Sequence, residues 1–94
     1  MRLSLRQRAE LDIHEAYDWY ESRQSGLGDM ILRSVDACFA RLCREPEICS
    51  ICYDRVRAAR LHRFPYSVFY VIRSDHVDVL SVYHGRRRPR RFEP

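Results

Sequence analysis

The sequence predicts an α+β fold in which an antiparallel pair of helices covers one face of an antiparallel sheet. The first half of the chain repeats apolar residues at helical spacing, and the second half alternates β-branched and aromatic runs with turn residues. A chain of 94 residues can bury one hydrophobic core but has no room for a second domain. We therefore expect a single domain over residues 1–94, with an N-terminal strand, two helices and a three-stranded meander.

Two helices are predicted after a short strand at residues 2–5. The apolar stripe of the first helix contains Ala9, Ile13, Ala16, Tyr17 and Tyr20, and the breaker pair Ser25-Gly26 ends it. The stripe of the second helix contains Leu27, Ile31, Val35, Cys38 and Leu42. This helix must end before Pro46, because the residue that precedes a proline avoids the helical region. The short connection between the two helices makes them antiparallel neighbours.

Three strands are predicted to follow the helices. Residues 57–64 mix polar and apolar side chains, Val68–Ile72 is apolar on both faces as in a central strand, and residues 77–83 are rich in β-branched side chains. The turn between the last two strands is Ser74-Asp75-His76. Since the helices cover one face of this sheet, we expect the opposite face to lie partly open and to carry the arginines of the meander.

The charge of the chain is unevenly distributed. All seventeen basic residues are arginine, and the net charge is +4. Residues 1–54 carry seven arginines against ten acidic residues, whereas residues 55–94 carry ten arginines against three. A basic C-terminal segment, residues 85–94, concentrates five of them. This half predicts an anionic partner, either nucleic acid or an acidic protein segment, although a solvated basic tail without a partner would look the same.

The location follows from the lack of long apolar runs. The longest run, Val68–Ile72, is far shorter than the about 20 residues of a membrane-spanning helix. Residues 1–8 contain no apolar core of a signal peptide. We expect a cytoplasmic protein that has no membrane partner.

One group of residues predicts either binding or catalysis. Three arginines of the meander and a histidine at its end are expected to converge, with the tail arginines behind them: Arg57, Arg60, Arg63 and His84, then Arg86, Arg87, Arg88, Arg90 and Arg91. Arginines beside a histidine suit metal-free cleavage of a phosphodiester, because the cations stabilise the transition state while the imidazole moves protons. The composition alone favours the alternative, a basic face that binds an acidic peptide and does no chemistry.

The cysteines, the acidic residues of the first helix and most of the aromatic residues are expected to have no functional role. Cys49 and Cys52 have the spacing of a zinc knuckle or a redox motif, but Cys38 belongs to the core stripe and Cys43 does not share its helix face. We expect incidental thiols, no metal and no cofactor. The acidic residues of the first helix, Asp12, Glu15, Asp18 and Glu21, are expected to be solvated bystanders. The aromatic residues Trp19, Tyr20, Tyr66, Phe69 and Tyr70 are expected in the core, with Tyr83 beside the basic group as the exception.

Several motifs in order resemble one protein family over residues 2–92. They are Asp12-Ile13-x2-Ala16-x2-Trp19-Tyr20, Gly26-Leu27-Gly28, Arg63-Phe64-Pro65-Tyr66-x2-Phe69-Tyr70 and Val79-Leu80-x-Val82-x-His84-x2-Arg87-x-Pro89. Together they resemble the RelE/ParE toxin superfamily, and the last two motifs lie closer to its ParE-like, plasmid-stabilisation side. The order of elements predicted from the residues agrees with the fold of that superfamily.

The resemblance implies the toxin of a bacterial type II toxin–antitoxin module, held inactive in a hetero-oligomer with a cognate antitoxin. ParE-like members inhibit DNA gyrase, and this is the target we favour. RelE-like members are metal-independent endoribonucleases that cut mRNA on the ribosome; in that case Arg63, Tyr83 and His84 would be catalytic. Many of those members end in a tyrosine where this chain has Phe92, which has no hydroxyl. A third possibility is an inactive relative that only binds its antitoxin.

Overall fold

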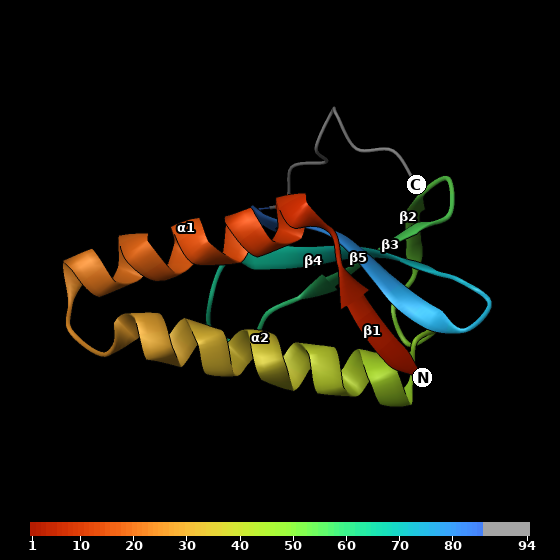
Figure 1. The fold of residues 1–94 in the computed structure, drawn as a ribbon, viewed down its shortest axis with the longest axis horizontal. Coiled ribbons are helices and arrows are strands. Elements are labelled where there is room, and N and C mark those ends of the chain that lie inside the picture. The colour runs from red at the N-terminus through yellow and green to blue at the C-terminus, as the bar shows by residue number, and fades with distance from the viewer. Residues whose placement is uncertain (86–94) are drawn as a thin grey trace.

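The chain folds as a helical hairpin against a five-stranded sheet (Figure 1). The computed structural model describes residues 1–85. The elements, in chain order, are β1 (Arg2–Leu5), α1 (Gln7–Arg23), α2 (Leu27–Arg44), β2 (Ile51–Tyr53), β3 (Val56–Arg60), β4 (Tyr66–Ile72) and β5 (His76–His84). The strand order is β1-β5-β4-β3-β2; β1 runs parallel to β5, and the other neighbours are antiparallel. The predicted α+β fold is therefore confirmed.

The meander has four strands where the sequence predicts three. The additional strand, β2, has three exposed residues, which is too short a run to give a periodic signal. The strand expected over residues 57–64 ends at Arg60. Beyond it, Arg63 adopts a left-handed backbone with φ of 74°, which is incompatible with a continuing strand, and Leu61 N–H donates to Tyr66 O (2.9 Å) to close the loop.

The connection between the helices depends on two glycines and one carboxylate. Gly26 has φ of 95°, a left-handed conformation that glycine adopts without a steric penalty. Glu21 accepts hydrogen bonds from the backbone N–H groups of Gly26 and Gly28, at 2.9–3.1 Å, and so satisfies donors at the start of α2. A Cβ on Gly28 would lie 2.6 Å from Cε2 of Tyr17. The helices can approach this closely because residue 28 has no side chain.

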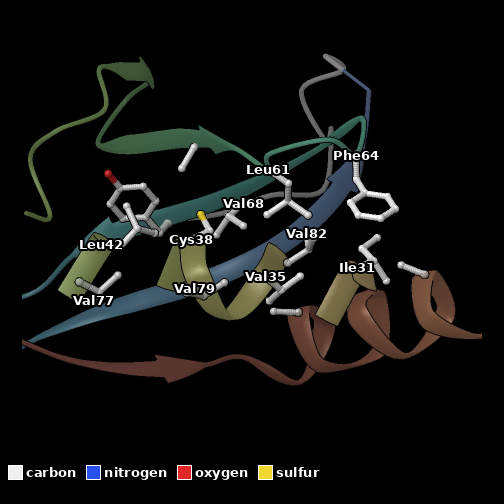
Figure 2. Close-up of a cluster of buried hydrophobic side chains, with 14 residues drawn as sticks. Ile31, Val35, Cys38, Leu42, Leu61, Phe64, Val68, Val77, Val79 and Val82 are labelled. Carbon is white, nitrogen blue, oxygen red and sulfur yellow. The ribbon is translucent and has the colours of Figure 1, made fainter. Parts of the chain in front are cut away.

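The main core lies between α2 and the sheet (Figure 2). The stripe predicted on α2 is buried as expected and contains Ile31, Val35, Cys38 and Leu42. It packs against the helix-facing residues of the central strands, among them Val68, Val77, Val79 and Val82. Burying a large aliphatic side chain stabilises a fold by about 1.5–3 kcal/mol, so this interface supplies most of the driving force for folding.

The opposite face of the sheet differs from the prediction of an open, arginine-bearing surface. It carries a second apolar cluster, made of Val56, Phe69, Val71 and Leu80 with Ala58 packed against it. Arg57 alternates with Ala58 and so shares the helix-facing side with Ala59 of the main core. The expectation was wrong for Arg57, because the period of two places apolar residues on both faces; the same period puts only the exposed Arg60 of β3 on the side of Val56 and Ala58.

Arg57 and Tyr70 hold the segment between α2 and β2. Nη1 of Arg57 donates to Cys49 O (2.6 Å) and Glu47 O (3.4 Å). The hydroxyl of Tyr70 donates to Pro46 O (2.7 Å). Burial of this hydroxyl raises the pKa of Tyr70, so it stays a donor at physiological pH. The segment has little regular structure of its own, and these bonds from the sheet give it a defined path.

Asp12 joins α1 to the edge of β5, which corrects the expectation that it is a bystander. The strand β1 pairs with β5 only as far as Val79, so the N–H groups beyond that point lack a strand partner on this side. The carboxylate of Asp12 accepts hydrogen bonds from Val82 N–H (3.0 Å) and the hydroxyl of Ser81 (2.9 Å), and Arg8 Nε donates to its other oxygen (3.0 Å). The helix thus completes the edge of the sheet where β1 ends.

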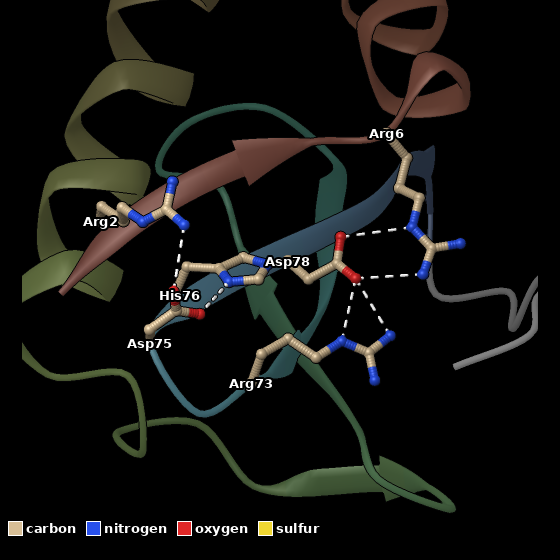
Figure 3. Close-up of polar contacts among 6 residues, drawn as sticks. All are labelled: Arg2, Arg6, Arg73, Asp75, His76 and Asp78. Atoms are coloured by element: carbon tan, nitrogen blue, oxygen red, sulfur yellow. Dashed lines mark hydrogen bonds and ion pairs between the residues drawn. The ribbon is translucent and has the colours of Figure 1, made fainter.

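A second carboxylate ties together three parts of the chain (Figure 3). Asp78 lies on β5 and receives hydrogen bonds from Arg6, which precedes α1, and from Arg73, which precedes the β4–β5 turn. Burial by itself would raise the pKa of Asp78, but the hydrogen bonds from the two guanidinium groups outweigh burial and hold the pKa below its usual 3.8. Asp78 is therefore ionised in the folded protein.

Candidate functional site

Nine of the twelve arginines in residues 1–85 fall into two groups. One group forms ion pairs with carboxylates near β1 and β5, and consists of Arg2, Arg6, Arg8 and Arg73. A second group has no ion pair within residues 1–85 and lines two recesses beside α2; its members are Arg33, Arg41, Arg44, Arg60 and Arg63. Free guanidinium groups gathered on one side of the fold are available to an external anion.

The first recess, which we call the basic recess, has a volume of about 440 Å³. It lies between the second half of α2 and the end of β3, and Arg41, Arg44 and Arg60 line it together with His62. Arg41 and Arg44 are one helical turn apart, so their side chains share a face of α2. Nε of Arg41 is buried and has no hydrogen-bond partner among residues 1–85.

The second recess, the apolar recess, has a volume of about 270 Å³ and continues from the first. Met30, Ala37 and Phe64 line it, with Arg33 and Arg63 as the charged residues. The two recesses share Ser34, Ala37 and His62. The hydroxyl of Ser34 donates to His62 O (2.7 Å), which fixes the 61–65 loop against the helix. We refer to both recesses together as the α2 groove.

A third recess, the aromatic recess, lies on the α1 side of the molecule and has a volume of about 370 Å³. It is lined by Glu15, Trp19, Tyr66 and His84. The rings of Tyr66 and His84 meet edge to face, with 5.1 Å between centroids. Trp19 is 51% exposed and its ring is covered by Arg23 at 4.4 Å, so the expectation that this tryptophan lies in the core was wrong.

The predicted catalytic residues are not gathered into one site within residues 1–85. Arg63 lines the apolar recess beside α2, whereas His84 lines the aromatic recess, where the charged neighbour is the carboxylate of Glu15. Tyr83 is exposed on β5 opposite Ser67 of β4, next to His84 but outside the lining of its recess. No arginine is among the described residues that line the recess of His84.

The predicted binding residues have different environments. Arg60 and Arg63 are exposed and line the α2 groove, while Arg57 is half-buried and binds backbone carbonyls of its own chain. The remaining predicted arginines, Arg86, Arg87, Arg88, Arg90 and Arg91, lie outside the described residues, as does Phe92.

Sequence reasoning missed the contribution of α2 to the groove. Arg33, Arg41 and Arg44 belong to the half of the chain with a net negative charge, so they did not stand out in the charge balance. Of the three, only Arg41 lies at the margin of the apolar stripe of α2, while Arg33 and Arg44 lie on the side of the helix away from it. A helical projection does not separate Arg33 from Asp29 and Asp36, which lie four residues before it and three residues after it, so the sequence could have singled out only Arg41.

The cysteines are free thiols in different environments. Cys38 is buried in the core, Cys43 and Cys49 are half-buried, and Cys52 is exposed on β2. Desolvation raises the pKa of Cys38 to about 11, although the nearby Arg41 opposes the shift. Within residues 1–85, no group of three or more histidine, cysteine or acidic residues could hold a metal ion. In the same part of the chain, neither helix has the length and apolar character needed to span a membrane.

The helical hairpin on a five-stranded sheet, with a groove beside α2 lined by arginines that form no ion pair within residues 1–85, defines a small basic α+β fold. A family model described as "ParE toxin of type II toxin-antitoxin system, parDE" matches residues 3–89. The chain therefore belongs to the ParE toxin family.

The comparison with solved structures agrees on the fold. A chain from the "Chromosomal ParDE TA system from P. aeruginosa" superposes with a TM-score of 0.81. The match covers 92% of this chain and 97% of that chain, at 17% sequence identity. No match was found among curated proteins. The predicted resemblance to the RelE/ParE superfamily is confirmed, on its ParE side.

Proposed function

We propose that this protein is the toxin of a type II toxin–antitoxin module, that it arrests growth by inhibiting DNA gyrase, and that a cognate antitoxin neutralises it in a hetero-oligomer. It acts in the cytoplasm, where gyrase is found. Its membership of the ParE toxin family supports the toxin assignment. The neighbouring fold in a ParDE system supports an antitoxin partner.

One observation carries the choice of gyrase over mRNA cleavage. RNA hydrolysis without a metal needs a group that moves protons next to cations that stabilise the phosphorane. His84 is the histidine predicted for this role, yet Glu15 and two aromatic rings line its recess, and Arg63 lines another. Glu15 is paired with Arg8 (3.0 Å), so the lining of this recess within residues 1–85 includes no arginine that would stabilise a phosphate beside the imidazole. This environment supports a surface that binds a protein target and performs no hydrolysis.

The basic C-terminal segment is the second part of the proposal. Residues 86–91 carry five arginines in six positions. A cluster of like charge of this kind steers association with an anionic surface and contributes guanidinium groups for bidentate contacts. We assign to Arg86, Arg87, Arg88, Arg90 and Arg91 the contacts on which inhibition of gyrase depends.

The test compares two activities of the purified chain. We expect inhibition of gyrase-catalysed supercoiling and no cutting of mRNA on ribosomes. His84→Ala should keep the inhibition, whereas removal of residues 86–94 should abolish it. Codon-specific mRNA cuts that fall about a hundredfold in His84→Ala, with supercoiling unaffected, would identify a RelE-like endoribonuclease instead. Binding to the antitoxin with neither activity would identify an inactive relative.

A further inference from the structure

We infer that residues 86–94 fold back over the face of the sheet opposite the helices, where Phe92 packs on the apolar cluster of that face. This cluster, which we call the outer cluster, consists of Val56, Phe69, Val71 and Leu80. The inference deepens the proposed function and rests on it for one consequence, because it gives the arginines assigned to gyrase a fixed position on the toxin. The packing itself is tested separately.

The outer cluster is too well buried for a sheet face that meets water. Within residues 1–85 its members are all strand residues, while both helices contribute only to the core on the other face. Val56 and Val71 are nonetheless 0% exposed. Side chains stand roughly perpendicular to a sheet, so those on a face without a second layer keep their tips in water. A further segment must therefore cover this cluster.

The covered area stops short of the end of the strands. Ser67 pairs with Tyr83 of β5 and with Arg60 of β3, and this row shares the face of Phe69 because residues two apart on a strand point the same way. Tyr83 is 36% exposed, and Arg60 is exposed as well. The cover therefore lies over the next two rows, those of Phe69 and Val71.

The chain supplies a segment that starts at this face. β5 ends at His84, and Gly85 adopts a left-handed backbone with φ of 79°, which ends the strand and lets the chain turn. Both edges of β5 are occupied, by β4 on one side and by β1 and Asp12 on the other. Since α2 covers the inner face, a segment that returns along β5 can do so only over the outer face.

The length of the segment brings its one large apolar residue to the outer cluster. A chain that turns back at Gly85 and runs extended along β5 brings Phe92, seven positions after the turn, level with Asp78, seven positions before it. Both distances are about 23 Å at a rise of about 3.3 Å per residue. Asp78 is the partner of Val71, so Phe92 comes level with a buried row of the cluster. The other residues of the segment are arginine, proline and glutamate.

The charge at the margin of the cluster matches the residue that follows Phe92. Asp78 borders the cluster and receives hydrogen bonds from Arg6 and Arg73 (Figure 3). Two positive charges thus share one carboxylate, and guanidinium groups can bind a second acidic group. Glu93 is the only acidic residue after Asp78. Packing of Phe92 on the cluster would bring this carboxylate to the two guanidinium groups.

This packing would hold the five arginines of the segment at both ends. At one end, Gly85 N–H donates to Pro65 O, and at the other end Phe92 is the apolar anchor. A segment that is ordered before it meets its target loses less conformational entropy on binding, so it binds more tightly than a free tail. Phe92 is therefore a positioning residue for the arginines between it and Gly85.

Photo-cross-linking of the full chain tests the packing. Phe92 is replaced with p-benzoylphenylalanine, which keeps the aromatic ring, and the irradiated protein is digested and mapped by mass spectrometry. We expect cross-links within one molecule from position 92 to the outer cluster. The matched control carries the same group in place of Trp19, an exposed residue of α1, and should give no link to this cluster. Links only between molecules, or none from position 92, would overturn the inference.

Two substitutions separate the packing from the charge. Phe92→Ala removes the anchor and keeps all five arginines, whereas Phe92→Leu keeps an apolar anchor. We expect Phe92→Ala to lower the urea midpoint of unfolding by about 1 M, and to raise the concentration that half-inhibits gyrase about tenfold. Phe92→Leu should retain most of the stability and most of the inhibition. If Phe92→Ala inhibits gyrase as strongly as the unaltered chain, the positioning role is wrong.

The outcomes separate this inference from the proposed function. Cross-links to the outer cluster in a chain that does not inhibit gyrase would support the packing and overturn the proposed target. Inhibition by the unaltered chain without such cross-links, and with the urea midpoint of Phe92→Ala unchanged, would overturn the packing and leave the proposed function intact.

Discussion

Replacing Asp12 with alanine should destabilise the fold far more than the same replacement at an exposed acidic residue of the same helix. The side chain of Asp12 is only 10% exposed, and it accepts hydrogen bonds from Val82 N–H and from the hydroxyl of Ser81. Both donors are buried, with 2% and 3% of their residues exposed. A buried donor left without a partner costs about 1–3 kcal/mol. We therefore expect Asp12→Ala to lower the free energy of unfolding by about 2–4 kcal/mol.

Urea denaturation followed by circular dichroism measures this change. For a domain of this size, it corresponds to a fall in Tm of about 8–30 °C. Asp18→Ala is the matched control, because Asp18 is an exposed residue of the same helix and gains the same helical propensity from alanine. Ser81→Ala alone should cost about 1 kcal/mol, and the double variant with Asp12→Ala should cost less than the sum of the two. If Asp12→Ala is no less stable than Asp18→Ala, the carboxylate does not complete the edge of β5 and the reasoning fails.

Three further predictions concern stability and reactivity. The pKa of Asp78 is lowered in the folded protein, so this residue stabilises the fold above the unfolded pKa of 3.8, and the stabilisation is lost as the pH falls through the folded pKa. Asp78→Asn should therefore reduce the loss of stability at acid pH, measured as the urea concentration at the unfolding midpoint plotted against pH. Gly28→Ala should cost about 1–3 kcal/mol in the same denaturation assay, since the new methyl group meets the ring of Tyr17. At pH 8, a pKa of about 11 leaves about a thousandth of Cys38 as thiolate; peptide mapping after iodoacetamide should find Cys52 modified and Cys38 intact.

Each of these three predictions has a result that would contradict it, and the first two have a control variant. Asp36→Asn, at an exposed position of α2, should leave the loss of stability at acid pH unchanged, and an Asp78→Asn curve as steep as that of the unaltered chain would contradict the pH assignment. Gly85→Ala tests a glycine with open space around it, where only the backbone is strained; a Gly28→Ala variant of unaltered stability would contradict the close approach of the helices. Equal labelling of Cys38 and Cys52 in the folded protein would show that Cys38 is not buried.

The helices and the two long strands could be read from the sequence because their signals are local. The apolar stripe of α2 recurs every three or four residues, and Ser25-Gly26 and Pro46 mark its limits. Val68–Ile72 and the strand after it are β-branched runs separated by a turn. The short β2 strand gave no such signal, and the end of β3 depended on the backbone conformation of Arg63. Local pattern thus determined the fold class, but not every strand boundary.

The residues of the candidate site also divide into those that the sequence indicated and those that only the structure revealed. Charge composition indicated an anionic partner and pointed to Arg60 and Arg63, both of which line the α2 groove. It could not show that Arg41 of a different element would join them, because the distance between α2 and β3 is set by core packing. Nor could it show that Arg63 and His84 line separate recesses.

The sequence by itself determined the α+β fold class, the resemblance to the ParE side of the RelE/ParE toxin superfamily and an excess of arginine in the second half of the chain. Only the tertiary structure decided that β1 pairs in parallel with β5, that Asp12 completes the edge of β5, and that His84 lies beside Glu15. The physical reason is the separation of the partners along the chain. Asp12 and Val82 are seventy residues apart, and no periodic pattern of side chains encodes a contact that the packing of a helix on a sheet creates.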